Sequence, residues 1–356
     1  MNIQTILEFV AALASLILIH EIGHFTACLL LKIPVEEFGI GFPPRMVTLF
    51  TVRDIKFSLN WLPFGGFVRP KGETDPEVPD GLAAARPWKR IVVFLAGPAM
   101  NLLAAVILYI AIYASVNYLP DRTRVELLEV VENTPAAQAG LQAGDMILRV
   151  GDEATESTQE LRAIIYDNLG QPIQVAYARD GKEYTTTVTP LANPGETGAI
   201  GIYMSQAVKP FNLFAAIPEG FVSTYEYGRE LLSMIGGLVR GTIPAEEGRL
   251  VGFKGMYDLY SMVRESGSTH EGGSAFASAL SFVISISISL GLFNLLPIPA
   301  LDGGRITFAL SELIMRKRIP YKFELAVNFI SFALLIILMV VVNLQDFINP
   351  VTIPTP

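Results

Sequence analysis

The pentapeptide His20-Glu21-Ile22-Gly23-His24 lies inside an otherwise apolar run from Ile6 to Leu31. At a helical rise of about 1.5 Å per residue this run is long enough to cross a bilayer, and His20 and His24 project from one helical face. Two imidazoles at this spacing can bind one metal ion, and the glutamate between them is close enough to act as a general base. The pattern therefore predicts a metal-dependent hydrolytic site at membrane depth.

The alternative interpretation is a chance motif whose histidines are solvated on a soluble helix. Water is scarce inside a bilayer, where a charged side chain costs about 2.5 to 3.5 kcal/mol, so ionisable residues there indicate function. Cys28 is the only cysteine and lies one turn beyond His24. It is either a further metal ligand or a small buried apolar side chain, and no intrachain disulfide is possible.

The composition indicates a membrane protein with an aqueous domain. The 356 residues are 51% hydrophobic and 17% charged, and the mean hydropathy is +0.44. These values are too apolar for an ordinary soluble protein and too polar for a chain that lies wholly in lipid. Residues 121–275 carry 12 Lys and Arg against 21 Asp and Glu, within a net charge of -8. This acidic balance argues against nucleic acid as a partner.

The distribution of apolar and basic residues predicts the membrane topology. Each of four apolar runs is long enough for a transmembrane helix: Ile6–Leu31, Ile91–Val116, Phe276–Leu296 and Leu325–Leu344. Residues 32–90 and 303–322 are rich in Lys and Arg, which places these loops in the cytoplasm and both termini outside. The first residues carry no basic side chain, so we expect the first run to stay as an anchor and not to be a cleaved targeting peptide.

A β-hairpin is expected in the first cytoplasmic loop. Apolar and polar residues alternate over Arg53–Phe67, with a turn at residues 63–68. The hairpin is either a connector at the lipid headgroups or a sheet edge that receives substrate as an added strand. The second hypothesis makes Gly65, Gly66 and Phe67 substrate-binding residues.

A separate aqueous unit is expected over residues 123–205, with strands at 125–131, 173–178 and 185–188 and a helix at 157–168. The string Asn133–Gly151 resembles the start of a bacterial, circularly permuted PDZ domain. Such a resemblance implies a domain that binds peptide ends by strand addition, and the alternative is a steric plug or spacer. Residues 210–272 are amphipathic and are expected on the outer membrane surface, with His270 in a solvated linker.

A third metal ligand is offered by the string Asn294–Gly304. Pro297 and Pro299 must break the third span, and Asp302 follows at membrane depth. A catalytic zinc site needs three protein ligands and one open position. The alternative role for Asp302 is to cap a helix that starts after Gly303.

These motifs, with Gly97-Pro98-Ala99-Met100-Asn101 at the second span, resemble bacterial site-2 proteases, which are intramembrane zinc metalloproteases of regulated intramembrane proteolysis. The resemblance covers nearly the whole chain and implies that His20, His24 and Asp302 bind Zn²⁺ and that Glu21 is the base. It also implies that Asn294 holds the unwound substrate or the tetrahedral oxygen, although a packing hydrogen bond is the alternative. Two departures are visible, Arg305 where family members commonly have His, and Gly252–Met256 in place of a Gly-Pro-Val-Gly-Ile string.

The expected fold is a multi-span α-helical membrane protein with four transmembrane helices, a cytoplasmic membrane-associated β-hairpin and an inserted extracytoplasmic PDZ-like α+β domain. The four spans are expected at residues 1–33, 91–118, 275–302 and 323–344. Between them we expect the β loop at 34–90, the PDZ-like domain at 122–206, the amphipathic region at 207–274 and a cytoplasmic loop at 303–322, with a tail at 345–356. We expect hydrolysis of transmembrane segments in single-span proteins, such as anti-sigma factors or remnant signal peptides, at an active site towards the cytoplasm. Lipid and a peptide at the PDZ-like domain are the other expected partners. A scaffold without catalysis and a proton or metal transporter are the rival interpretations.

Overall fold

The computed structural model describes residues 3–151, 153–195, 198–243, 248–269 and 275–350. The chain divides into two compact units, one made of Met1–Ser115 with Ile217–Pro356 and the other of Val116–Ala216. The expectations for His270 and for residues 351–356 fall outside the described residues. Each unit has its own hydrophobic core.

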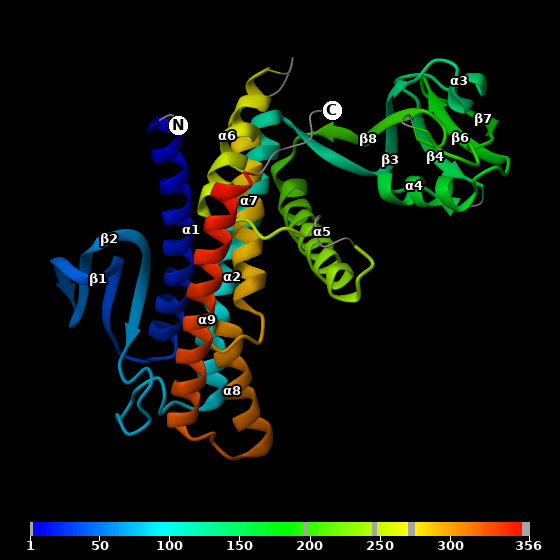
Figure 1. Cartoon of the computed structure of the whole chain (residues 1–356). Helices are drawn as coiled ribbons and strands as arrows, with labels where there is room; N and C mark the ends of the chain where they lie inside the picture. The colour runs from blue at the N-terminus through cyan, green and yellow to red at the C-terminus, as the bar shows by residue number, and fades with distance from the viewer. Residues whose placement is uncertain (1–2, 152, 196–197, 244–247, 270–274, 351–356) are drawn as a thin grey trace. The chain divides into compact units, whose positions relative to one another are not determined.

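Among the described residues, four helices are long and apolar enough to cross a membrane. They are α1 (Ile3–Leu30), α2 (Pro87–Val116), α7 (Ala275–Asn294) and α9 (Tyr321–Ile348), and Figure 1 shows them running alongside one another. The four apolar runs expected from the sequence are thereby confirmed as helices.

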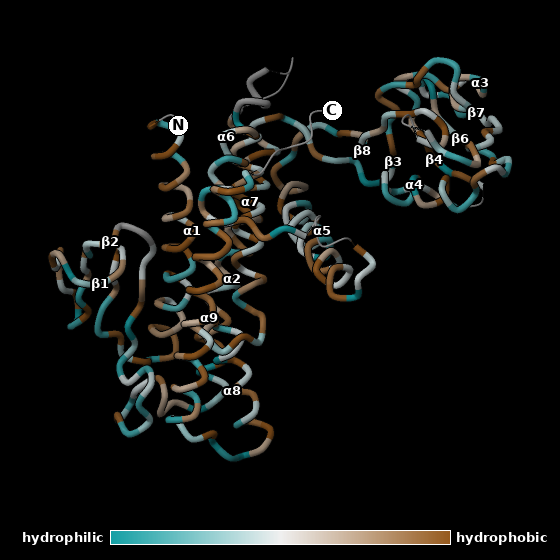
Figure 2. Tube along the Cα trace, in the orientation of Figure 1, coloured by the Kyte–Doolittle hydropathy of each residue, from teal (hydrophilic) through white to brown (hydrophobic). Residues whose placement is uncertain are grey.

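The outer surface of this helical unit is apolar. Hydrophobic residues follow α1, α2 and α9 in Figure 2, and Phe329, Phe332 and Ile337 of α9 are exposed. Apolar side chains of this kind are compatible with lipid. The backbone is compatible with it too, because every backbone group within a helix finds its hydrogen-bond partner internally. Inside the unit α1 and α2 approach closely, because Gly23 faces the carbonyl of Ala96 at a place where a Cβ would lie only 2.3 Å away. Small residues at such crossings let backbones pack without a gap.

The β-hairpin exists, but its strands and its turn differ from the expectation. β1 (Val35–Val52) pairs antiparallel with β2 (Ile55–Pro70), and Arg53 and Asp54, both at positive φ, form the turn. The turn expected at residues 63–68 corresponds to a bend within β2, because the segments 56–59 and 66–69 pair with residues 37–40 in opposite directions and Gly65 between them has a φ of +88°. The strand β1 was not predicted because Pro43 and Pro44 lie in it, and proline usually marks the end of a strand.

Residues 66–69 of β2 form an edge of this sheet. Each of the residues 37–40 is paired both with residues 56–59 and with residues 66–69, so the 37–40 segment lies between the other two. Glu37 is buried there and accepts hydrogen bonds from Arg45, Ser58 and Arg69. These contacts fix the 66–69 segment on the sheet.

The third span ends just before the two prolines that were expected to break it. Pro297 and Pro299 cannot donate to a helical ladder, and α7 accordingly ends at Asn294. The chain then turns back, and α8 (Asp302–Met315) begins at Asp302. The connection expected as a loop over 303–322 thus consists largely of a helix, because its apolar residues recur at helical spacing.

The amphipathic region forms two helices, α5 (Leu213–Arg240) and α6 (Phe253–Thr269). The carboxylate of Asp346 on α9 is fully buried and accepts hydrogen bonds from the backbone N–H groups of Gly252 and Gly255 at 2.7 and 3.1 Å. It also pairs with Arg249 at 3.0 Å. The glycines of the divergent 252–256 string therefore let the start of α6 approach α9.

The second unit is a six-stranded antiparallel sheet in the order β7-β6-β4-β3-β8, with β5 paired to β4. Two helices complete it, and Ser157 caps the longer one by accepting from the Glu160 N–H. The expected helix and strands are all present, together with three further strands. The elements are β3 (Tyr118–Val130), α3 (Pro135–Gln138), β4 (Met146–Val150), β5 (Glu153–Ala154), α4 (Thr158–Asp167), β6 (Ile173–Arg179), β7 (Lys182–Val188) and β8 (Ile202–Pro210).

Candidate metal centre and active site

The first part of the site is one face of α1. His20 and His24 stand one helical turn apart, and their Nε2 atoms are 3.1 Å from each other. The Nδ1 atom of His24 lies 2.8 Å from the carbonyl oxygen of Val93 on α2 and donates its proton there. Because a neutral imidazole carries one proton, this bond leaves a lone pair on Nε2 of His24.

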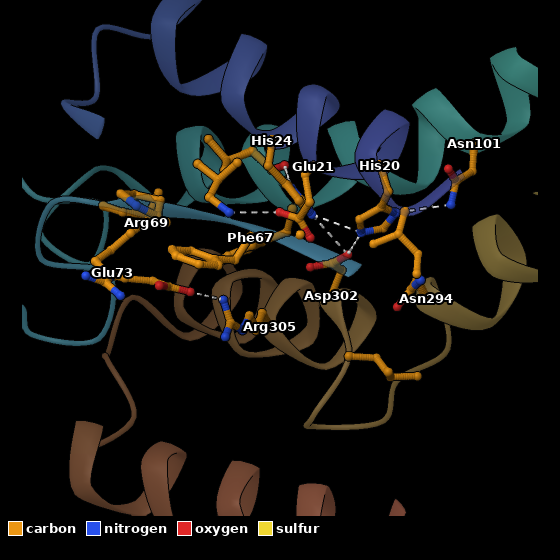
Figure 3. A pocket seen from close by; sticks show the side chains of 18 of the residues that line it. His20, Glu21, His24, Phe67, Arg69, Glu73, Asn101, Asn294, Asp302 and Arg305 are labelled. Carbon is orange, nitrogen blue, oxygen red and sulfur yellow. Dashed lines mark hydrogen bonds and ion pairs between the residues drawn. The ribbon is translucent and has the colours of Figure 1, made fainter. Parts of the chain in front are cut away.

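Asp302 joins the two histidines from a distant part of the chain. Its Oδ2 atom is 3.0 Å from Nε2 of His20 and 3.3 Å from Nε2 of His24. The N-cap of α8 is Leu301, so Asp302 is not the capping residue. The reversal of the chain after Asn294 therefore delivers a carboxylate to the α1 histidines (Figure 3).

The three donor atoms fit one zinc ion. The potential ligand atoms of His20, His24 and Asp302 all lie within 4.8 Å of one another, and the edges of their triangle measure 3.0 to 3.3 Å. Two ligands at about 2.1 Å from a tetrahedral zinc are about 3.4 Å apart. Two imidazoles and one carboxylate match the ligand set of catalytic zinc, which keeps a fourth position open.

The ligand set also fits a divalent cation by charge. An ionised Asp302 beside two neutral imidazoles would neutralise part of the charge of the ion.

The candidate ligands open into a cavity of about 500 Å³. Glu21 lines this cavity beside the histidines, and its Oε2 atom accepts a 3.0 Å hydrogen bond from the backbone N–H of Val68 in β2. Figure 3 shows Glu21 between the α1 histidines and the strand. A carboxylate held in this way has a defined orientation towards the cavity.

The candidate substrate-binding residues are distributed around this cavity. Gly66 and Phe67 line it, whereas Gly65 does not; Gly65 adopts a φ of +88° at the bend of β2. Asn294 also lines the cavity, and its Nδ2 atom donates to the carbonyl oxygen of Leu290 in its own helix at 3.0 Å. The structure thus brings Gly66, Phe67 and Asn294 to the cavity that contains Glu21.

Three contributors to the site were not assigned from the sequence. Gly97 on α2 leaves space beside the imidazoles, because a Cβ there would lie 2.4 Å from Nε2 of His24 and 2.7 Å from Nε2 of His20. Val68 contributes only its backbone, which no sequence pattern reveals. Arg305 pairs with Glu73 at 2.5 Å at the cavity wall, and this carboxylate raises the pKa of the guanidinium despite the opposing effect of burial.

Comparison with known proteins identifies the family. The model of peptidase family M50 matches residues 8–338. The chain belongs to peptidase family M50. A Clostridium perfringens protein named as a zinc metalloprotease is 35% identical over 96% of this chain and 97% of its own length. The regulator of sigma-W protease RasP of Bacillus subtilis is 27% identical over 97% of this chain and 99% of its own length.

This M50 peptidase is a zinc metalloprotease of the site-2 type, and four helices among its described residues are of the membrane-spanning kind. The scaffold and transporter interpretations are thereby set aside. Among solved structures, a PDZ domain of an SdrC-like protein from Listeria innocua is 28% identical, with a TM-score of 0.21, and covers 24% of this chain and 96% of that domain.

Proposed function

We propose that this M50 peptidase hydrolyses peptide bonds within transmembrane segments of single-span membrane proteins, with His20, His24 and Asp302 as zinc ligands and Glu21 as the base. One observation carries the proposal. The three donor atoms converge within 4.8 Å, and they do so in the wall of the cavity that also contains the Glu21 carboxylate.

His20, His24 and Asp302 would hold a zinc ion, which when bound would polarise the scissile carbonyl and favour attack by water near neutral pH. Glu21 accepts a proton as the water oxygen bonds to the carbonyl carbon, and then passes it to the amine that leaves when the C–N bond breaks. The N–H of Val68 holds one carboxylate oxygen in place throughout. Asn294, which lines the same cavity, can donate to the oxygen that gains negative charge.

The substrate binds as an extended strand along residues 66–69 of β2. This segment has β1 on one side only, and the N–H of Val68 points away from β1 towards Glu21. A transmembrane helix must unwind before its amides are accessible, and an open strand edge stabilises the unwound form by main-chain hydrogen bonds. Gly66 lets this segment lie close to α1, since a Cβ there would lie 3.1 Å from Leu18 and 3.5 Å from Cγ of Glu21.

The orientation in the membrane places the metal centre towards the cytoplasm and the 116–216 unit outside. The basic residues of the segments 32–90 and 303–322 support this orientation. Single-cysteine variants at Lys317 and Lys182, both exposed, test it with a membrane-impermeant maleimide on intact cells. Cys28 is buried, so the background labelling is low. Labelling at Lys317 but not at Lys182 would contradict the orientation.

The 116–216 unit acts as a PDZ-like domain that limits substrate size or holds a peptide end. β8 is the outermost strand of its sheet as described, and a cavity of about 430 Å³ lies between α4 and β8. Arg162 and Tyr166 of α4 and Ile202 and Met204 of β8 line this cavity. An extended peptide fits such a groove as an added strand.

The decisive experiment compares the purified wild type with Glu21→Gln and Asp302→Ala, using a single-span substrate in detergent or liposomes. We expect Glu21→Gln to keep a full complement of zinc and to lose at least about 10²-fold in cleavage rate, because only the proton acceptor is gone. Asp302→Ala should lose both zinc and activity. Substitution of the exposed Glu77 by Ala serves as the control. Normal turnover by Glu21→Gln, or full zinc in Asp302→Ala, would contradict the assigned roles.

A further inference from the structure

Asn101 on α2 contacts the metal centre from behind. It is 1% exposed, and its Nδ2 atom lies 3.2 Å from Nδ1 of His20. Figure 3 shows the amide on the far side of the His20 ring from Asp302. The Oδ1 atom of the same amide is buried and has no hydrogen-bond partner in the described part of the chain. A buried acceptor without a partner is unfavourable and requires an explanation.

The proton on His20 provides this explanation. If Nε2 of His20 binds a metal ion, the single proton of the neutral ring is on Nδ1, which must then donate a hydrogen bond. The partner it needs is an acceptor, whereas Nδ2 of an amide is a donor. Rotation of the Asn101 amide by half a turn exchanges its two ends, which have nearly the same shape. Oδ1 then accepts the Nδ1 proton, and the unpartnered acceptor disappears.

We propose that Asn101 is a positioning residue of the metal centre, whose Oδ1 accepts the Nδ1 proton of His20 and keeps the Nε2 lone pair directed at the ion. The inference rests on the metal site proposed above. His24 has the same arrangement, since its Nδ1 donates to the Val93 carbonyl. Both ligand imidazoles are thus oriented by α2, one by the backbone and one by a side chain.

The support for Asn101 extends to a third helix. Ser287 of α7 is fully buried and donates from Oγ to the backbone carbonyl of Asn101 at 2.8 Å. This bond holds the Asn101 backbone between α1 and α7. The amide therefore has a fixed position from which to orient the His20 ring.

The test compares Asn101→Asp with Asn101→Leu in the full-length purified protein. Asp offers only acceptors, and Leu offers neither donor nor acceptor at similar volume. We expect Asn101→Asp to bind zinc within about threefold of the wild type in competition with a chelating dye, and Asn101→Leu to bind about 10- to 100-fold more weakly. Wild-type affinity in Asn101→Leu would overturn the proposal. Equal weakening of both variants would also overturn it, because the amide would then act as a donor.

Two further variants separate the possible failures. Ser287→Ala removes the helix contact but keeps the Asn101 amide, and its zinc affinity should stay within about twofold of the wild type. If His20→Ala keeps full zinc, the metal site itself is wrong. If His20→Ala loses zinc while Asn101→Leu does not, only the role of Asn101 is wrong.

The visible absorption of Co²⁺-loaded Asn101→Asp gives a readout that is independent of activity. We expect a tetrahedral spectrum like that of the wild type, and loss of that spectrum would count against the proposal.

Discussion

The backbone N–H of Val68 donates a 3.0 Å hydrogen bond to Oε2 of Glu21, and this bond joins the outer segment of β2 to the helix that carries the histidines. The strand edge and the Glu21 carboxylate therefore have a fixed relative position. A substrate added to residues 66–69 would place its backbone beside Glu21. The same bond also makes the orientation of Glu21, the proposed base, depend on a strand that contributes no candidate metal ligand.

Replacement of Val68 by Pro tests this dependence. Proline removes the N–H, and the sheet keeps its pairing because this N–H points away from β1. We expect unchanged zinc content and a cleavage rate lowered by about 10-fold or more, since the carboxylate loses its orientation. Val68→Ala keeps the N–H and should behave like the wild type. A Val68→Pro enzyme of normal rate would show that the bond does not orient the base.

Gly97→Ala is expected to prevent metal binding. The added Cβ would lie 2.4 and 2.7 Å from the Nε2 atoms of His24 and His20, so both imidazoles must move. Zinc content per protein, measured after dialysis against a weak chelator, should fall to a small fraction of the wild-type value. Gly236→Ala is the matched control, because a Cβ there meets no atom within 4 Å. Full zinc occupancy in Gly97→Ala would mean that the helices separate easily at this crossing.

The sheet of β1 and β2 should lose stability in acid through Glu37. Burial acts to raise the pKa of Glu37, but hydrogen bonds from Arg45 and Ser58 and the charge of Arg69 lower it below its usual value. A depressed pKa in the folded state contributes stability above the unfolded pKa, which is lost as the pH falls below about 4.3 towards the folded value.

Hydrogen exchange of residues 35–70, corrected for intrinsic rates, measures this effect in the full protein. We expect protection to fall between about pH 5 and pH 3 in the wild type. Glu37→Gln should show weaker protection at neutral pH and little further change in acid. A parallel decline in both proteins would assign the acid sensitivity to other groups.

Excision of the 116–216 unit tests its proposed role as a size filter. Tyr118 pairs with Pro210, and the N–H of Phe211 donates to the Asn117 carbonyl, so the two ends of the unit lie together and a short linker can replace it. We expect the excised enzyme to cleave substrates with a large outer domain that the wild type rejects. Met204→Glu keeps the bulk of the unit but places a charge in its groove. If size selection persists after excision, the filter is wrong; if Met204→Glu also loses selection, peptide binding is the operative role.

Much of the fold could be predicted from local patterns. Long apolar runs indicate membrane helices whatever their neighbours are. Pro297 and Pro299 predict the end of α7, because proline has no backbone N–H to donate to a helical hydrogen bond. The helix at Thr158–Asp167 was predictable from the spacing of its apolar residues, and the structure adds the Ser157 cap. β1 was missed because its prolines and glycines resemble loop residues and its partners in β2 supply the order.

The types of reactive side chain at the site follow from the chain's local pattern, because the spacing of His20, Glu21 and His24 along one helix depends only on helical geometry. Which groups meet depends on folding. Asp302 reaches His20 across 282 residues, and Asn101 approaches the other side of the same ring across 81 residues. Such contacts depend on the packing of separate helices and on the direction of side chains and backbone N–H groups at each crossing. No local periodicity encodes them, so the orientation of Glu21 and the contact behind His20 arise only when α1, α2, α8 and β2 are packed together.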